Sequence, residues 1–256
     1  MATPTIYPDL AGRVAVVTGG SRGIGAATAG YLAANGVAVA VVGRDEGALS
    51  SVAAGIQESG GRAIGVRADC TVEDDVVALR DAVLSDLGAP DIVAAFAGGA
   101  GRPIPASEET AAHWRMVLDS ELVSTFLTVS AFLPAMLEQG QGVILTMASA
   151  AARQPARSSA PYAAAKAGVI AYTRQLATEL GPKGIRVNCL SPSAVENDKM
   201  RAGMTPEQRE ALGATFPLGR IGQPSDVAAA ALFLASASAS WITGVVLDVA
   251  GGKIMV

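Results

Sequence analysis

Tyr162 and Lys166 stand four positions apart in the alanine-rich stretch APYAAAKAG, residues 160–168. Alanine favours a helix, and side chains four residues apart lie on one helical face, with Cβ atoms roughly 5–6 Å apart. A free tyrosine hydroxyl keeps its proton up to about pH 10, and a neighbouring ammonium stabilises the tyrosinate form. The stretch is therefore either an ordinary helix with two surface side chains or a proton donor placed beside its activating cation.

Ser149 precedes Tyr162 by thirteen residues and follows the apolar run GVILTMA, residues 142–148. A serine at the end of a strand can donate a hydrogen bond to a substrate oxygen, or it can simply satisfy backbone groups there. Residues for other chemistries are scarce. The single histidine, His113, has no partners at metal-ligand spacing and is expected on a helix surface, so we predict no metal site. The G-x-S-x-G elbow of serine hydrolases is absent.

A glycine-rich turn lies between the first predicted strand and the first predicted helix, in VAVVTGGSRGIGAA. Gly19, Gly23 and Gly25 give the spacing G-x-x-x-G-x-G. Glycines permit a tight turn and close backbone approach, and the helix N-terminus that follows attracts a pyrophosphate. The pattern predicts dinucleotide binding; the alternative is a turn that only packs tightly.

Short Val/Ile/Ala-rich runs alternate with longer helical stretches along the whole chain. The runs are continuously apolar, as in parallel strands covered on both faces. We therefore predict an α/β Rossmann fold: a doubly wound parallel sheet of about seven strands, with helices on both faces, in a single domain over residues 1–256. The polar stretch 193–216 interrupts the rhythm and is predicted to be a small substrate lid. The predicted strands are 13–18, 37–43, 62–69, 91–98, 142–148, 184–191 and 244–252.

Composition excludes several functional classes. The net charge of −4 and the absence of a Lys/Arg-rich block argue against nucleic-acid binding. The first residues lack the pattern of a signal peptide, and no uninterrupted apolar run is long enough to cross a bilayer, so no membrane partner is expected. Cys70 and Cys189 are not in a CxxC pair and are predicted to be buried free thiols, as in a cytoplasmic protein.

Together these motifs resemble the short-chain dehydrogenase/reductase family over almost the whole chain. TGGSRGIG resembles its cofactor turn and YAAAK its Tyr-x-x-x-Lys pair, while the Ser149–Tyr162 separation and three C-terminal stretches also match. The resemblance implies that Ser149, Tyr162 and Lys166 are catalytic, and that Lys166 also holds the nicotinamide ribose. It implies that the cofactor is bound by Gly19, Ser21, Arg22, Gly23, Ile24, Gly25, Arg44, Asp69, Cys70, Ala97, Gly98, Tyr162, Lys166, Pro192, Val195 and Asn197.

The charges around the second strand favour NADP(H) over NAD(H). NAD-binding folds of this type commonly end the second strand with an acid that binds the ribose 2′-OH. Here that place reads VVGRDE, with Arg44 after Gly43 and with Arg22 in the glycine turn. Two guanidiniums suit a 2′-phosphate. The alternative is that Arg44 is solvated and Asp45 faces the ribose.

The chain departs from the family pattern at three places. AFAG, residues 95–98, stands where the family has Asn-Asn-Ala-Gly, and Asn197 replaces a threonine near the cofactor. Glu121 stands 28 residues before Ser149, where most of the family has an asparagine near the catalytic lysine. We include Glu121 among the candidate catalytic residues, with Ser120 as the adjacent alternative for that position. A carboxylate facing Lys166 would stabilise its ammonium and partly cancel its field at Tyr162.

The function predicted from these observations is NADPH-dependent, reversible reduction of a ketone or 3-oxoacyl-type carbonyl to a secondary alcohol. The competing hypothesis is a cofactor-binding protein with little turnover that acts as a redox sensor or structural subunit. Arg102, Arg153 and Arg157, in loops near the expected pocket, either meet an anionic substrate or are solvated. The apolar tail from residue 241 and the helix predicted over 114–137 favour a homotetramer.

Overall fold

The computed structural model describes residues 4–99 and 103–255, and in this part of the chain seven parallel strands form one sheet. The strand order is β3-β2-β1-β4-β5-β6-β7. Each predicted strand is present with its bounds shifted by a few residues at most, which confirms the doubly wound α/β prediction. The strands are β1 Val14–Thr18, β2 Ala38–Gly43, β3 Arg62–Arg67, β4 Ile92–Ala95, β5 Gly142–Met147, β6 Ile185–Pro192 and β7 Val246–Val249.

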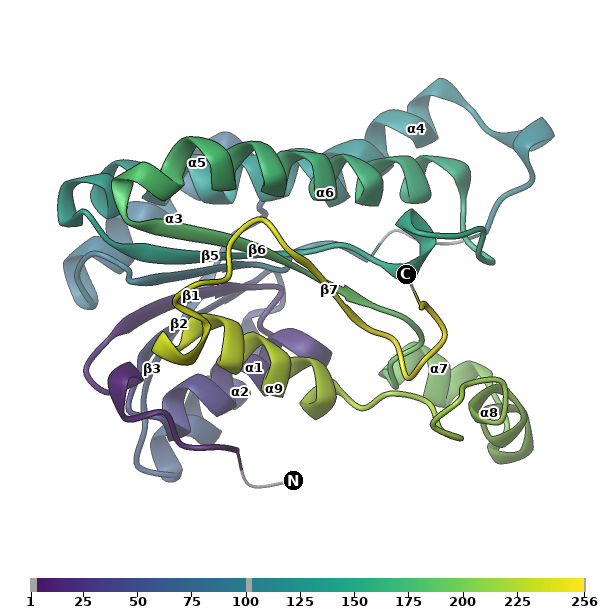
Figure 1. Cartoon of the computed structure of the whole chain (residues 1–256), viewed down its shortest axis with the longest axis horizontal. Coiled ribbons are helices and arrows are strands. Elements are labelled where there is room, and N and C mark those ends of the chain that lie inside the picture. The colour runs from purple at the N-terminus through teal and green to yellow at the C-terminus, as the bar shows by residue number, and fades with distance from the viewer. Residues whose placement is uncertain (1–3, 100–102, 256) are drawn as a thin grey trace.

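Helices cover both faces of the sheet (Figure 1). One layer contains α1 Gly23–Ala34, α2 Glu46–Glu58 and α9 Pro224–Ala235. The opposite layer contains α3 Glu73–Asp86, α4 Ala111–Leu118, α5 Ser124–Gln139 and α6 Ala160–Leu180. The polar stretch predicted as a lid forms two short helices, α7 Asp198–Gly203 and α8 Pro206–Gly213.

The two helical layers explain why the strands are continuously apolar. Successive residues of a strand point to opposite faces, so Val16 and Ile144 enter the core under α3, α5 and α6, whereas Val17 and Leu145 enter the core on the side of α1 and α9. The edge strand β3 is less covered, since Ala63 is its one buried residue and Arg62, Gly65 and Arg67 are exposed. The central strands are buried on both faces, so neither face has to carry polar side chains.

The strand order reverses between β1 and β4, and this switch point opens a crevice at the carboxyl ends of the strands. Thr18, the last residue of β1, is fully buried there. Its Oγ1 accepts hydrogen bonds from the backbone N–H groups of Phe96 and Ala97, at 3.0 and 3.1 Å. The Thr18 hydroxyl thus joins the carboxyl ends of two neighbouring strands beside the AFAG segment, where the two family asparagines are missing.

The helix predicted over 114–137 runs from Ala111 to Gln139 and includes a π-helical turn, Asp119–Val123, between α4 and α5. By length and composition alone this helix is apolar enough to cross a bilayer, with a mean hydropathy of 1.5, although charged residues interrupt its apolar run. Its buried side chains, among them Val129 and Phe132, pack into the core beneath α5. This packing against the sheet accounts for the buried part of its apolar side chains, whereas others, such as Phe126, are exposed.

Candidate active site

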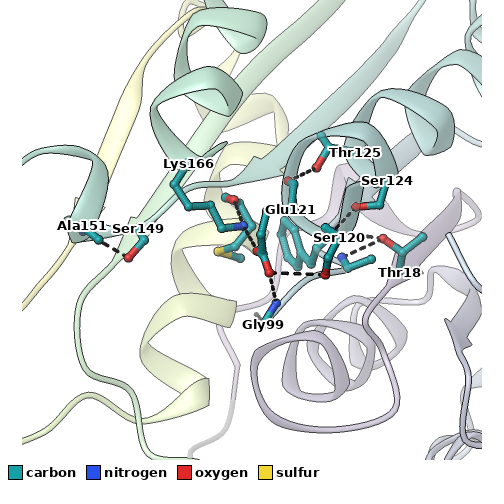
Figure 2. Close-up of polar contacts among 12 residues, drawn as sticks. Thr18, Gly99, Ser120, Glu121, Ser124, Thr125, Ser149, Ala151 and Lys166 are labelled. Atoms are coloured by element: carbon teal, nitrogen blue, oxygen red, sulfur yellow. Dashed lines mark hydrogen bonds and ion pairs between the residues drawn. The ribbon is translucent and has the colours of Figure 1, made fainter. Parts of the chain in front are cut away.

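Lys166 is a buried cation held by two oxygen atoms (Figure 2). Its Nζ lies 2.9 Å from Glu121 Oε2 and donates to the carbonyl oxygen of Met147 at 2.8 Å. Lys166 is 3% exposed and Glu121 is fully buried. An ammonium at such a depth requires a charged or hydrogen-bonding partner. The structure therefore places Glu121, rather than Ser120, against the lysine.

The π-helical turn and the segment after β4 together enclose the Glu121 carboxylate. Glu121 lies at the middle of the wide turn Asp119–Val123, and π-helical turns are frequent at functional sites. The backbone N–H of Gly99 donates to Glu121 Oε1 at 2.5 Å. At Gly98 the φ angle is +151°, and a Cβ would collide with Glu121 Oε2. Gly98 is therefore needed because the backbone passes directly over the carboxylate.

Tyr162 lies one helical turn before Lys166 on α6 and is partly exposed. The Nζ of Lys166 is 5.8 Å from the centre of the Tyr162 ring. Met147, which accepts from Lys166, ends β5 two residues before Ser149, so the lysine and the serine meet at the carboxyl end of this strand. The predicted four-residue spacing thus places Tyr162 beside Lys166. The Lys166 ammonium contacts the strand end on one side and lies near the tyrosine ring on the other.

Ser149 has a structural contact of its own. Its Oγ accepts from the backbone N–H of Ala151 at 3.2 Å and caps the short 3-10 turn Ala150–Ala152. A hydroxyl that accepts a hydrogen bond keeps its O–H as a donor. The two roles expected for Ser149, backbone satisfaction and substrate binding, are therefore compatible.

The glycine-rich turn has the close backbone contacts that its sequence predicts. Gly19 has φ +65°, and a Cβ there would lie 2.7 Å from Phe96 O. A Cβ on Gly25 would collide with Gly19 O, whereas Gly23, at φ +56°, faces open space. Arg22, the N-cap of α1, makes no side-chain capping hydrogen bond. The first N–H groups of α1 and the open side of the turn therefore fit an anionic pyrophosphate.

A cleft of about 910 Å³ adjoins this turn. Its walls come from the glycine turn, the ends of β2 and β4, the α4 region and the lid. The cleft is large enough for an extended ligand, and its cations suit phosphate groups. The residues present therefore fit a nicotinamide dinucleotide. The lining residues are Arg22, Arg44, Thr71, Gly98, Gly99, Ala112, Arg115, Met116, Asp119, Ser120, Asn197, Asp198 and Lys199.

Both predicted 2′-phosphate ligands are exposed and line the cleft. Arg22 pairs with Asp45 at 2.8 Å, and Asp45 also accepts the backbone N–H of Ala48 at the start of α2. Arg44 Nη1 lies 3.6 Å from Asp69 Oδ2. Hydrogen bonds from the Thr71 backbone and hydroxyl, together with Arg44, hold the pKa of Asp69 below its usual range. Asp45 thus caps α2 and pairs with Arg22, while the side chain of Arg44 is largely exposed.

The other predicted cofactor residues lie around the same crevice. The partly buried Ile24 side chain packs against the core, and Ser21 lies beside Gly43. Cys70 is buried, and burial raises the pKa of its thiol to about 11. Ala97 donates its N–H to Thr18, while Pro192 and Val195 are buried ahead of α7. Asn197 Oδ1 caps α7 by accepting from Met200 N.

Three expectations about individual side chains need correction or fall outside the described residues. His113 is only 16% exposed, since its Nδ1 contacts Glu109 Oε2 at 2.6 Å, so it is not a solvated helix-surface residue. Arg153 is neither solvated nor shown meeting a ligand: it lies 3.4 Å from Asp248 of β7. Arg157 is exposed, and Arg102 lies outside the described residues. Both buried cysteines are free thiols, as predicted.

The sequence reasoning missed several contacts in this region. Thr18 joins the ends of β1 and β4, and the carbonyl oxygen of Met147 accepts from Lys166. A threonine at the end of a strand and a backbone oxygen give no sign of these roles in the sequence. Thr71, Asp119 and Lys199 line the cleft. Lys199 is a charged residue in the polar stretch 193–216 and could have been suggested on that ground, whereas Asp119, at the start of the π-helical turn, carries no such signal.

We predict that the Lys166–Glu121 contact is an electrostatic anchor of the folded state. Glu121→Leu leaves a buried ammonium without its carboxylate and should lower the free energy of unfolding by about 3–5 kcal/mol. Glu121→Leu combined with Lys166→Met removes both charges and should restore most of that loss. Denaturant unfolding followed by circular dichroism measures both variants. A double variant no more stable than Glu121→Leu alone would show that the charge pair is not the anchor.

The comparisons with known proteins agree with this site. The family model described as Enoyl-(Acyl carrier protein) reductase matches residues 19–253. Cis-4-hydroxycyclohexanecarboxylate dehydrogenase of Sinomonas cyclohexanicum is 40% identical over 240 residues, which cover 94% of the chain and 96% of the relative. The 3-oxoacyl-acyl-carrier-protein reductase of Chlamydia muridarum is 36% identical over 246 residues, which cover 95% of the chain and 98% of the relative.

Among solved structures, 7α-hydroxysteroid dehydrogenase complexed with NADH and 7-oxo glycochenodeoxycholic acid superposes with a TM-score of 0.90. It is 36% identical in sequence, and the match covers 97% of this chain and 96% of that one. The glycine turn, the Tyr162–Lys166 helix and these full-length similarities agree. The chain belongs to the short-chain dehydrogenase/reductase family and is an NAD(P)-dependent oxidoreductase.

Proposed function

We propose that the protein reduces a ketone to a secondary alcohol with NADPH, reversibly, and that Ser149, Tyr162 and Lys166 carry the chemistry. The observation that carries the proposal is the position of the Lys166 ammonium. It is fixed 5.8 Å from the Tyr162 ring and is bound to the strand end that leads to Ser149. A cation in this place stabilises the negative charge left on a tyrosine that has given up its proton.

The nicotinamide would supply the hydride when it is bound in the cleft. Tyr162 would donate its proton to the substrate oxygen as negative charge develops there. Ser149 would hydrogen-bond the same oxygen and so lower the energy of the developing alkoxide. Lys166 would stabilise the tyrosinate and hold the cofactor ribose, while Glu121 would keep the lysine in place and charged.

The substrate that we propose is a 3-oxoacyl-type or ring ketone. Among the relatives, the names specify a hydroxycyclohexanecarboxylate, a 3-oxoacyl group and a 7-oxo steroid, which share a secondary alcohol or ketone within an apolar skeleton. Screening a panel of such ketones and alcohols with NADPH and NADH tests the proposal. Tight cofactor binding without turnover of any member would favour the alternative, a cofactor-binding protein that acts as a redox sensor or structural subunit.

Replacing the proton donor separates chemistry from binding. Tyr162→Phe removes only the hydroxyl, so we expect kcat to fall by about a hundredfold or more, with cofactor affinity nearly intact. Lys166→Ala should reduce both kcat and cofactor affinity, because the lysine has two roles. Steady-state kinetics and fluorescence titration with NADPH measure these effects. Substantial turnover by the Phe variant would remove Tyr162 from the mechanism.

The proposed preference for NADPH rests on Arg22 and Arg44, which line the cleft, while Asp45 caps α2 and pairs with Arg22 itself. Arg44→Asp should change the NADPH/NADH ratio of kcat/KM by about tenfold or more toward NADH, the size expected for losing a charge-assisted hydrogen bond. Arg174→Asp, at an exposed position of α6, makes the same charge change as a control. If Arg44→Asp leaves the ratio unchanged, Arg44 does not bind the 2′-phosphate.

We also propose a homotetramer, because large apolar side chains are exposed on two separate parts of the fold. Met116 and Phe126, on α4 and α5, are 50% and 48% exposed. Trp241 is 99% exposed just before the edge strand β7, and Met255 is 80% exposed after it. Two isologous contacts would bury both parts. Sedimentation velocity should give about four times the chain mass, and a monomer at every concentration would refute the proposal.

A further inference from the structure

Glu196 joins the two lid helices to the body of the protein. Its Oε1 lies 3.2 Å from Arg201 Nε on α7 and 3.2 Å from Arg209 Nη1 on α8. Its Oε2 accepts from Gln223 Nε2 at 2.8 Å. The Glu196 side chain is 18% exposed, so these contacts are partly shielded from solvent. One carboxylate thus contacts both short helices and the residue that precedes α9.

The turn before α9, which contains Gln223, is held to the body of the protein by several hydrogen bonds. The Glu196 N–H donates to Gly222 O at 2.8 Å, and the Gly222 N–H donates to Ala194 O at 3.0 Å. Gln223 donates its N–H to Asp226 Oδ2, and Asp226 also makes two hydrogen bonds with Arg220, at 2.6 and 2.9 Å. Behind this turn, α9 packs into the core. Gln223 is therefore a fixed point, whereas α7 and α8 are short helices with mostly exposed residues.

The residues that follow Glu196 form one wall of the cleft. Asn197, Asp198 and Lys199 line it together with Arg22 and Arg44. They begin α7, and Asn197 caps that helix through Met200. Any displacement of α7 away from Glu196 must therefore move this wall relative to the glycine turn. The carboxylate that positions the lid also positions a side of the cofactor cleft.

We propose that Glu196 is a positioning residue that clamps both lid helices to the turn before α9 and thereby sets how tightly the cleft retains its dinucleotide. This inference rests on the proposed function only in placing the dinucleotide of this family in the cleft. Arg201 is the contact that matters most for the cleft wall, because it lies on α7 itself. Arg209 holds α8, which contributes no residue to the lining of this cleft.

The clamp remains charged under ordinary conditions. Hydrogen bonds from Gln223 and Arg201 hold the pKa of Glu196 below its usual range. A carboxyl whose pKa is depressed by folding stabilises the folded state above its unfolded pKa and loses that effect as pH falls. The clamp is therefore complete at neutral pH, and neutralising the carboxylate by substitution imitates its acid form.

The test compares Glu196→Ala and Glu196→Gln with Glu210→Ala, which removes an exposed acid on α8 outside the cluster. Stopped-flow fluorescence of bound NADPH, without substrate, gives the dissociation rate. We expect Glu196→Ala to raise this rate by about tenfold, with a smaller rise for Glu196→Gln and none for Glu210→Ala. Trypsin should also cleave the lid faster after Lys199 or Arg201. With a substrate in hand, KM for NADPH should rise while kcat changes less than about twofold.

Arg201→Met removes the contact between α7 and Glu196, together with the 4.0 Å pair between Arg201 and Asp198, and serves if Glu196→Ala does not fold. It should raise the dissociation rate by about threefold, and Arg209→Met should raise it less. An unchanged NADPH dissociation rate in Glu196→Ala would overturn the inference, whether or not trypsin cleavage accelerates. Faster dissociation without faster cleavage would also overturn it, since the lid would then not be the cause. A protein that shows the expected effect but reduces no ketone would contradict the proposed function and leave this inference standing.

Discussion

The buried contact between Lys166 and Glu121 is the interaction on which the site depends. A lysine that is 3% exposed cannot keep its charge unless oxygen atoms replace the lost water, and Glu121 Oε2 and Met147 O supply them. Each element that meets here has a local feature that allows the contact. The helix over Ala111–Gln139 widens into a π-helical turn, and the chain after β4 passes over the carboxylate at a glycine.

This contact also relates the reactive end of the site to the cofactor end. Gly99 donates to Glu121, and Gly98 and Gly99 line the same cleft as Arg22 and Arg44. The polar contacts of Glu121 therefore link Lys166 on α6 to Gly99 at the edge of the cleft. In the proposed mechanism, a carboxylate in this place would stabilise the ammonium and weaken its field at Tyr162, and so favour proton donation over proton abstraction. Such a site would be better suited to reduction than to oxidation.

Much of the fold follows from the sequence because its signals are local or strictly periodic. Strands buried on both faces are continuously apolar, and a tyrosine four residues before a lysine must share its helical face. Glu121 could be foreseen because it is a charged residue at a position where the family pattern has an amide. What the sequence leaves undetermined is how its segments pack in the folded chain. Val129 and Phe132 make a long helix apolar because it covers a sheet, which composition alone cannot distinguish from a membrane span.

The misjudged polar residues have the same cause. Arg153 and His113 sit in segments that read as exposed, but Asp248 and Glu109 lie against them in the folded chain. In the sequence, Thr18 is an ordinary strand residue, but in the fold its hydroxyl accepts from the N–H groups of Phe96 and Ala97. Partners more than 70 residues apart, as for Thr18, are settled by strand order. The partner of a helix-start histidine is settled by a loop whose path the sequence does not determine.

The central claim is that the Glu121 carboxylate acts on Tyr162 through the charge of Lys166. The most direct measurement is the pH dependence of kcat/KM for alcohol oxidation in the wild type and in Glu121→Asn, with a good substrate. The Asn amide oxygen can still accept from the ammonium and replace the lost water, so the lysine keeps its charge while the opposing negative charge is gone. The full field of the ammonium then acts on the tyrosine, and the tyrosinate needed for oxidation forms more readily. The account predicts that the rising alkaline limb of the profile moves to lower pH in Glu121→Asn. A limb that stays in place would show that Glu121 holds the lysine without affecting the proton on Tyr162.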